Sequence, residues 1–356
     1  MTPDTRRAYI GFDTSNYTTS AAAVVLDEHG RPEVIANCKC PLPVEPGARG
    51  LRQSDAVFAH TRNLPRVTRE LREILTARGC LVAAVAASAT PRDAEGSYMP
   101  CFLSGLVAAE AFLSGARVTA GDRTPPVDAD VGRVSHQSGH IMAALWSSGA
   151  LADGVAAAPF LAFHVSGGTT EVVVATPRLS SETDGETAVS LGFDVTLVGG
   201  GADLHAGQVV DRVGVMLGLD FPCGPALEAL AATNTTPLPP VRPTVREGIC
   251  HLSGLENQAA TLWKKTADPA LVAAYTLTHI GKALRLMTDQ IESARLLRGE
   301  SPLPVVYAGG VMSNKLIRPL LTDGATVPLY FAEPAFSADN AAGVALLCLA
   351  AHGGLS

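Results

Sequence analysis

Two histidines four residues apart are the residues of this chain best suited to chemistry. His136 and His140 stand where the chain enters an apolar stretch typical of a helix, and their spacing places both imidazoles on one helix face. Such a pair can bind a metal ion, and two structural histidines are the alternative. Gln137 stands where the zinc-protease motif has a glutamate, so that motif's general base is missing and simple protease chemistry is disfavoured.

A carboxylate near the other end of the chain is a second candidate. Asp339 lies at the head of the last predicted helix, residues 338–351. An aspartate at this place has an ordinary role as the N-cap of the helix. The sequence alone leaves the capping role and a functional role open.

Glycine-rich segments offer places where a ligand could approach the backbone. Gly309-Gly310 follow a buried strand, and Asn314 could hydrogen-bond a base or a ribose. Gly199-Gly200-Gly201, then Gly207 and Asp211, predict a flexible loop, a helix N-terminus and a carboxylate that could reach ribose hydroxyls. Ordinary glycine turns beside a solvated aspartate are the alternative.

A repeated hairpin is the element that could position these groups. Residues 8–26 have the pattern strand, polar turn and strand, and residues 160–175 repeat it 151 residues later. The positions in register are Phe12/Phe163, Ser15/Ser166, Thr18/Thr169 and Thr19/Thr170. Each hairpin offers backbone N–H groups and hydroxyls to phosphate oxygens, so two facing hairpins would clamp a nucleotide. The repeat predicts two similar lobes, although each turn alone could be an ordinary β-turn.

The remaining sequence patterns predict an α/β protein. Helical patterns cover residues 57–78, 102–114 and 269 to about 297, a buried strand covers 303–308, and a Pro-rich connector covers 236–243. With 356 residues, 47% of them hydrophobic and 17% charged, the chain should form two lobes of about 150–200 residues each.

Composition also limits the function classes. The net charge of −7 argues against broad nonspecific nucleic-acid binding, although a local basic patch or a basic partner would remain compatible with it. Seven scattered cysteines predict reduced thiols and not a disulfide framework. No apolar stretch is long enough to cross a membrane, and the first residues lack the features of a secretory signal, so we expect a cytoplasmic protein.

Taken in order, the motifs resemble the TsaD family, also called YgjD or Gcp and formerly labelled O-sialoglycoprotein endopeptidase. The resemblance runs through nearly the whole chain. It is carried by Gly-Phe-Asp-Thr-Ser at 11–15, His136-x-x-x-His140, Val165-Ser166-Gly167-Gly168, Asp203 to Gly207 with Asp211, residues 218–225, Ser253-Gly254-Leu255, Gly309-Gly310-Val311 with Asn314, and Asp339-Asn340-Ala341-Ala342.

The resemblance implies an actin-like, sugar-kinase-like ATPase (ASKHA) fold, with two similar lobes around a nucleotide cleft. Residues 1–140 and about 320–356 would form lobe I, and about 141–319 would form lobe II. It implies one divalent metal ion, iron or zinc, with the ligands His136, His140, His164 and Asp339. Here His164 stands where the family often has a tyrosine. An ATP- or AMP-type nucleotide, or the adenylate intermediate, would contact Ser166, Gly167, Gly168, Gly207, Asp211 and Asn314.

The implied reaction transfers threonylcarbamoyl from threonylcarbamoyl-adenylate to N6 of the tRNA adenosine next to the anticodon. Partner proteins of the tRNA-modification machinery, one of which makes the adenylate, would accompany it. No residue is assigned as a catalytic acid or base, because Tyr17 and Thr18 replace the family's acidic pair. The chain therefore has the pattern of a divergent paralogue. A carbamoyl or acyl transferase for another acceptor and a nucleotide-binding regulator remain as alternatives.

Overall fold

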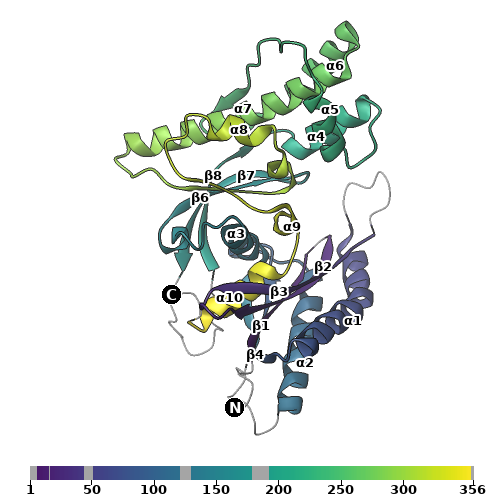
Figure 1. Cartoon of the computed structure of the whole chain (residues 1–356), viewed down its shortest axis with the longest axis vertical. Coiled ribbons are helices and arrows are strands. Elements are labelled where there is room, and N and C mark those ends of the chain that lie inside the picture. The colour runs from purple at the N-terminus through teal and green to yellow at the C-terminus, as the bar shows by residue number, and fades with distance from the viewer. Residues whose placement is uncertain (1–5, 16, 44–50, 121–129, 179–191, 354–356) are drawn as a thin grey trace. The chain divides into compact units, whose positions relative to one another are not determined.

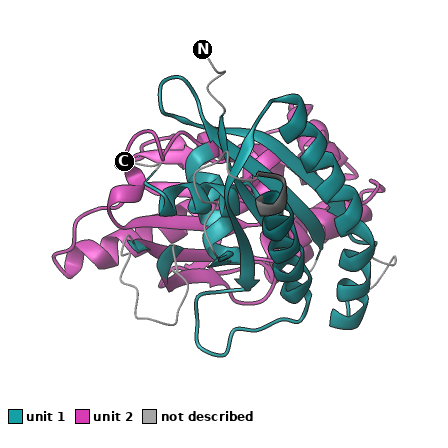
Figure 2. Ribbon diagram, turned by 90° about the horizontal axis from the view of Figure 1, so that it is seen from below, with its two compact units in different colours: residues 1–146, 177–194, 339–356 teal, residues 147–176, 195–338 magenta. Residues whose placement is uncertain are grey.

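The computed structural model describes residues 6–15, 17–43, 51–120, 130–178 and 192–353. The chain divides into two compact units (Figure 2): unit 1 holds residues 1–146, 177–194 and 339–356, and unit 2 holds residues 147–176 and 195–338. The boundaries expected at about 140 and 320 differ from these. Residues 320–338 pack within unit 2, while the described residues 177–178 and 192–194 are assigned to unit 1.

The scaffold of unit 1 is a five-stranded sheet with the order β3-β2-β1-β4-β5 (Figure 1). Its strands are β1 (Arg7–Thr14), β2 (Thr18–Leu26), β3 (Pro32–Pro41), β4 (Leu81–Thr90) and β5 (Gly132–Ser135). β1, β2 and β3 form antiparallel pairs, whereas β4 and β5 continue the sheet in parallel. The first predicted hairpin is therefore present as β1 and β2. Asn16 in its turn lies outside the described residues.

Helices cover both faces of this sheet. They are α1 (Gln53–Ala77), α2 (Cys101–Ala120) and α10 (Ala342–Ala351), while α3 (His136–Ser147) directly follows β5. Ile10 and Phe12 of β1 pack with Val67 and Leu71 of α1. Because side chains alternate along a strand, the residues between them face α10. A Cβ on Gly11 would lie 2.5 Å from a backbone nitrogen of α10, so only glycine permits this close packing.

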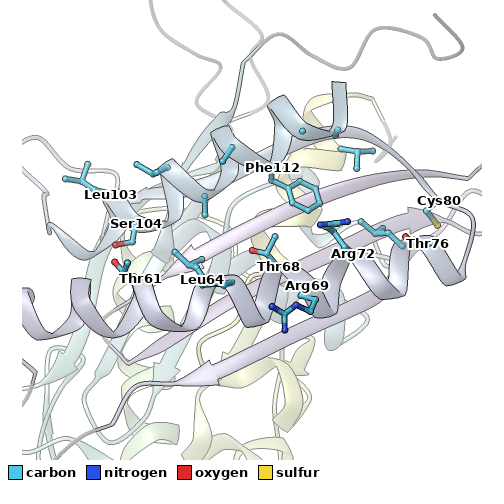
Figure 3. Close-up of a pocket in the computed structure, with 18 of the residues that line it drawn as sticks. Thr61, Leu64, Thr68, Arg69, Arg72, Thr76, Cys80, Leu103, Ser104 and Phe112 are labelled. Atoms are coloured by element: carbon cyan, nitrogen blue, oxygen red, sulfur yellow. The ribbon is translucent and has the colours of Figure 1, made fainter. Parts of the chain in front are cut away.

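An apolar groove of about 1120 Å³ lies between α1 and α2 (Figure 3). Leu64, Leu103 and Phe112 line it, together with the longer side chains of Arg69 and Arg72. None of the site residues predicted above lines this groove.

Unit 2 is built on a seven-stranded sheet with the order β12-β11-β6-β7-β8-β10-β9. Its strands are β6 (Phe160–Val165), β7 (Thr170–Arg178), β8 (Gly192–Gly201), β9 (Thr244–Arg246), β10 (Ile249–His251), β11 (Val305–Ala308) and β12 (Leu329–Phe331). The strand ends at 177–178 and 192–194 are assigned to unit 1. β6 and β7 pair antiparallel, so the second predicted hairpin is also present.

The helices of unit 2 are α4 (Ala206–Met216), α5 (Gly224–Ala232), α6 (Ser253–Thr266), α7 (Pro269–Leu297), α8 (Ile317–Thr322) and α9 (Pro334–Ser337). Two short 3₁₀ turns, Val155–Ala157 and Gly310–Ser313, complete the unit. α7 has the predicted bounds, because Asp268 accepts a hydrogen bond from the backbone of Leu271 and proline occupies the first helical position. Within the described part of the chain, no helix has both the length and the apolar character needed to cross a membrane.

Candidate functional site

Three of the four predicted metal ligands converge in unit 1. His136 and His140 lie one turn apart at the start of α3, and Asp339 lies just before α10. His140 Nε2 is 3.1 Å from His136 Nε2 and 3.1 Å from Asp339 Oδ1, while His136 Nε2 is 3.7 Å from the same oxygen. In the described residues this is the group of histidine, cysteine and acidic side chains whose ligand atoms could share one ion.

The close crossing of α3 and α10 explains this convergence. A Cβ on Gly343 would lie 1.8 Å from the carbonyl oxygen of Gly139, so the two helices can meet only through glycines. This contact brings the segment before α10 beside the first turn of α3. Asp339 is therefore not the N-cap of the last helix. That alternative was wrong: the N-cap is Ala341, and the side chain of Asp339 turns to His140.

The start of α3 is fixed from its other side. Ser135 Oγ accepts a hydrogen bond from the backbone of Ser138 at 3.0 Å, which is the usual capping contact of a helix N-terminus. The Asp93 carboxylate accepts hydrogen bonds from both serine hydroxyls and pairs with Arg178 at 3.2 Å. These contacts hold the start of α3, and its first two turns carry the two histidines.

The electrostatics of the cluster favour a negative charge on Asp339 and a positive charge on His136. Burial by itself would raise the pKa of Asp339, but the hydrogen bond from His140 and the nearby imidazoles hold it far below its usual range. Burial would lower the pKa of His136. The negative charge of Asp13 and its hydrogen bond outweigh that effect and, with Asp339, raise the pKa of His136 to about 9. The cluster therefore has an affinity for positive charge at its centre.

The donor set fits a divalent transition-metal ion. Two imidazole nitrogens and one carboxylate oxygen are typical ligands of zinc and iron, and three protein ligands leave a position for a substrate or water. In a tetrahedral site with bonds of about 2.0–2.1 Å, ligand atoms lie about 3.3 Å apart. The separations of 3.1 to 3.7 Å between these three atoms match that requirement.

His164, the fourth predicted ligand, lies on β6 in unit 2, where it pairs with Glu171 across the hairpin. The other three predicted ligands belong to unit 1. Its role as a ligand stays a prediction.

A second candidate site lies within unit 2. A pocket of about 620 Å³ is lined by Gly167, Gly207, Asp211 and Asn314 of the six predicted nucleotide contacts. Ser166 and Gly168 belong to the same turn as Gly167, between β6 and β7, but are not among its lining residues. The turn, the start of α4 and the segment after β11 thus contribute to one pocket.

Close backbone packing builds this pocket. Gly207 donates its backbone N–H to the carbonyl of Ser166 at 3.1 Å, and a Cβ on Gly207 would lie 2.6 Å from the nitrogen of Gly167. Thr170 Oγ1 accepts from the backbone of Ala206 at 2.9 Å. The N-terminus of α4 is therefore fixed against the turn, as an anion-binding helix end requires.

The two polar side chains of the pocket are held by the backbone. Asp211 Oδ1 accepts from the N–H of Cys223 at 2.9 Å. Asn314 Oδ1 accepts from Leu316 and Ile317 at 2.9 and 3.1 Å. These contacts fix both side chains, and the remaining carboxylate oxygen and amide nitrogen are the groups suited to a ligand.

Sequence reasoning missed some residues of these sites. Gly224 and Glu228 of α5 also line the pocket, although the run 218–225 was used only for the resemblance. Asp13 was not predicted to contact the cluster. The alternation of Asp13 and Ser15 along one face of the first hairpin was the signal that could have suggested it.

The comparison with protein families decides the identity of the chain. The model of TsaD, described as tRNA N6-adenosine threonylcarbamoyltransferase, matches residues 55–346. The chain belongs to the TsaD family. The match spans the cluster in unit 1 and the pocket in unit 2, and it confirms the resemblance carried by the motifs. The first hairpin, which precedes residue 55, lies outside the matched range.

A solved structure, that of HypF, supports the fold. HypF from T. kodakarensis is 13% identical with a TM-score of 0.50, and the match covers 98% of this chain and 48% of that one. Component A of (R)-2-hydroxyglutaryl-CoA dehydratase from Acidaminococcus fermentans is 15% identical with a TM-score of 0.44, covering 99% and 95%. At such identities the likeness concerns the fold alone. The chain has the actin-like ATPase fold, as predicted.

Proposed function

We propose that this TsaD-family protein transfers a threonylcarbamoyl group from threonylcarbamoyl-adenylate to N6 of the tRNA adenosine next to the anticodon, with the help of one divalent metal ion. The observation that carries the proposal is the convergence of His136, His140 and Asp339 on a point suited to a cation. The ion is iron or zinc. His164 is proposed as a further ligand, and the expected lobes around a nucleotide cleft are part of the same proposal.

Each site has a distinct task in this reaction. The backbone of Ser166, Gly167 and Gly168 and the start of α4 at Gly207 bind the phosphate of the adenylate. Asp211 accepts hydrogen bonds from the ribose hydroxyls, and Asn314 binds the base or the ribose. These contacts position the nucleotide.

In unit 1, His136, His140 and Asp339 would hold the metal ion. A bound metal ion supplies Lewis-acid polarisation of the group being transferred. Because the pKa of His136 is about 9, this histidine would have to lose a proton to bind a metal ion, so metal affinity is expected to rise as the pH approaches 9.

The residues expected to assist the acceptor amine suggest a second candidate reaction. Tyr17 is 48% exposed and, with Thr18, stands where the family has an acidic pair. Without that pair the attacking amine has less assistance in losing its proton. A carbamoyl or acyl transfer to another acceptor is therefore the alternative, and a nucleotide-binding regulator is a third.

The test is transfer of labelled threonylcarbamoyl from its adenylate to unmodified tRNA. Supplying the adenylate directly removes the need for a partner that makes it. Structural zinc sites with four ligands bind with about 10–16 kcal/mol, so one ligand is worth about 3 kcal/mol, or roughly a hundredfold in metal affinity. His140→Ala is expected to weaken metal binding by at least that factor and to lose transfer.

The control is His29→Ala, which changes an exposed histidine in the turn between β2 and β3. Transfer by wild type and His29→Ala but not by His140→Ala supports the proposal. If labelled tRNA is absent while label reaches a small molecule or a protein, the acceptor is different. Nucleotide binding without any transfer supports the regulatory alternative.

A further inference from the structure

The end of β1 carries two side chains to the candidate metal cluster. Asp13 and Ser15 are two residues apart on the face that packs towards α10, and their exposed fractions are 0% and 3%. Thr14 between them faces the other way, where its hydroxyl donates to the carbonyl of Cys101 at 2.9 Å and accepts from Gly105 at 3.0 Å. Strand alternation thus separates two residues that face the cluster from one that does not.

Asp13 fixes the ring of His136. Its Oδ1 accepts a hydrogen bond from His136 Nδ1 at 2.9 Å. A histidine that donates through Nδ1 presents Nε2 to a metal, and a carboxylate partner also makes that nitrogen a stronger donor of electrons. His136 Nε2 is the atom that faces His140 and Asp339.

The second carboxylate oxygen of Asp13 is also compatible with a cation at the cluster. Oδ2 is buried and has no hydrogen-bond partner within the described residues. A buried carboxylate that is only half hydrogen-bonded is costly unless positive charge lies nearby. A cation bound through His136 would supply such charge beside the Asp13 carboxylate and offset this cost.

Ser15 acts on the second ligand in the same way. Its hydroxyl donates to Asp339 Oδ2 at 2.7 Å, which leaves Oδ1 directed to His140 at 3.1 Å. The carbonyl of Ser15 accepts from His60 Nε2 at 2.8 Å, and the other ring nitrogen of His60 contacts Thr19 Oγ1 at 2.8 Å. The backbone at Ser15 is therefore held by a buried histidine of α1.

We propose that Asp13 and Ser15 are positioning residues of the metal centre. Asp13 orients the imidazole of His136, and Ser15 orients the carboxylate of Asp339, so that Nε2 and Oδ1 converge on one ion. This inference rests on the proposed function, because it requires a metal ion at the cluster. It assigns a role in unit 1 to the hairpin that precedes the range matched by the family model.

The test measures the affinity of the metal-free full chain for Zn²⁺ and Co²⁺ in competition with a chromophoric chelator. Asp13→Asn is expected to weaken binding about 10- to 100-fold, as loss of a carboxylate partner of a metal-bound histidine does. Ser15→Ala is expected to weaken it by up to about tenfold. The absorption spectrum of the Co²⁺-saturated protein should shift in both variants, since a changed ligand orientation alters the ligand field.

Thr14→Val is the matched control. It removes two buried hydrogen bonds from the residue between the proposed pair, so it should lower the melting temperature. Its metal affinity and Co²⁺ spectrum should equal those of wild type. A structural role for the strand end would change all three variants alike, whereas a positioning role changes only two.

The outcomes separate this inference from the proposed function. If wild type binds neither ion, the metal centre and the positioning role are both overturned. If wild type binds and Asp13→Asn and Ser15→Ala bind equally well with unchanged spectra, only the positioning role is overturned. If Asp13→Asn does not fold, Ser15→Ala decides. Loss of metal affinity in a protein that transfers nothing to tRNA supports the positioning role and contradicts the transferase.

Discussion

The two hairpins of this protein share a sequence pattern, but one makes its contacts through side chains and the other through its backbone. In unit 1 the hairpin β1–β2 acts through side chains, because Asp13 and Ser15 contact the candidate ligands. In unit 2 the hairpin β6–β7 acts through its backbone, because Gly207 packs directly on the turn at Gly167. His164 occupies the position in the second hairpin that corresponds to Asp13 in the first.

The carbonyl after each first strand shows the same contrast. The carbonyl of Ser15 accepts from the His60 side chain at 2.8 Å, and that of Ser166 accepts from the backbone of Gly207 at 3.1 Å. One repeat can therefore support a cluster of polar side chains in one unit and a close backbone approach in the other. Substitutions should separate the two: removing side-chain groups affects the first hairpin, and adding a Cβ affects the second.

Gly207→Ala should have the largest effect. The new Cβ would lie 2.6 Å from the backbone of Gly167, which cannot move as a flexible side chain could. Overpacking costs about 1–3 kcal/mol, and the upper end corresponds to a loss of roughly a hundredfold in affinity. We expect ATP and AMP affinity, measured by calorimetry, to fall by about that factor while the metal affinity of unit 1 stays unchanged.

Gly254→Ala on α6 is the control for Gly207→Ala, because the nearest atom to its new Cβ is a side-chain nitrogen at 3.8 Å. It should bind nucleotide like wild type. If Gly207→Ala bound nucleotide with wild-type affinity, the backbone of the turn at Gly167 would not contribute to nucleotide binding.

His60 should make the first hairpin sensitive to acid. Burial lowers the pKa of His60 below its usual value near 6.5, despite the opposing effects of Ser15 and Asp13. Its contribution to stability is therefore complete above about pH 6.5 and is lost as the pH falls below that value. Amide hydrogen exchange at pH 7.5 and 5.5 should show loss of protection in β1 and β2.

His60→Gln tests the cause. It should lower stability at pH 7.5 by about 1–2 kcal/mol through weakened hydrogen bonds and should flatten the pH response of the first hairpin. His279→Gln is the matched control, since burial lowers the pKa of this histidine of α7 in unit 2 to about 4. An unchanged pH response of β1 and β2 in His60→Gln would assign the acid sensitivity to another group.

Sequence patterns predicted the elements that depend on local signals. Both hairpins formed, and α7 runs from Pro269 to Leu297 because its capping signals stand next to each other in the chain. The start of the last helix was predicted too early. Asn340 accepts a hydrogen bond from Ala342 and keeps the preceding residues out of the helix.

Contacts between distant residues were harder to predict. The spacing of His136 and His140 suggested a metal pair, but the role of Asp339 rested on the resemblance. Their convergence depends on the packing of Gly139 against Gly343, which no local pattern reports. Asp13 and His136 are 123 residues apart, so only the folded sheet brings them together. The pocket in unit 2 likewise depends on backbone approach, which glycine permits without specifying its partner.

Ser166→Ala should have the smallest effect and tests the contrast most directly. Ser166 is the counterpart of Ser15, but its hydroxyl accepts a longer hydrogen bond of 3.3 Å from the exposed Gly168 within the same turn. An exposed local contact of this kind contributes about 0.5 kcal/mol or less, so nucleotide affinity should change by no more than about twofold. Ser15→Ala should cost more, because it releases the partly buried carboxylate of Asp339, a candidate ligand. If Ser166→Ala instead weakened nucleotide binding as strongly as Gly207→Ala, the second hairpin would also act through its side chain. The two hairpins would then differ in what they bind and not in how they bind it.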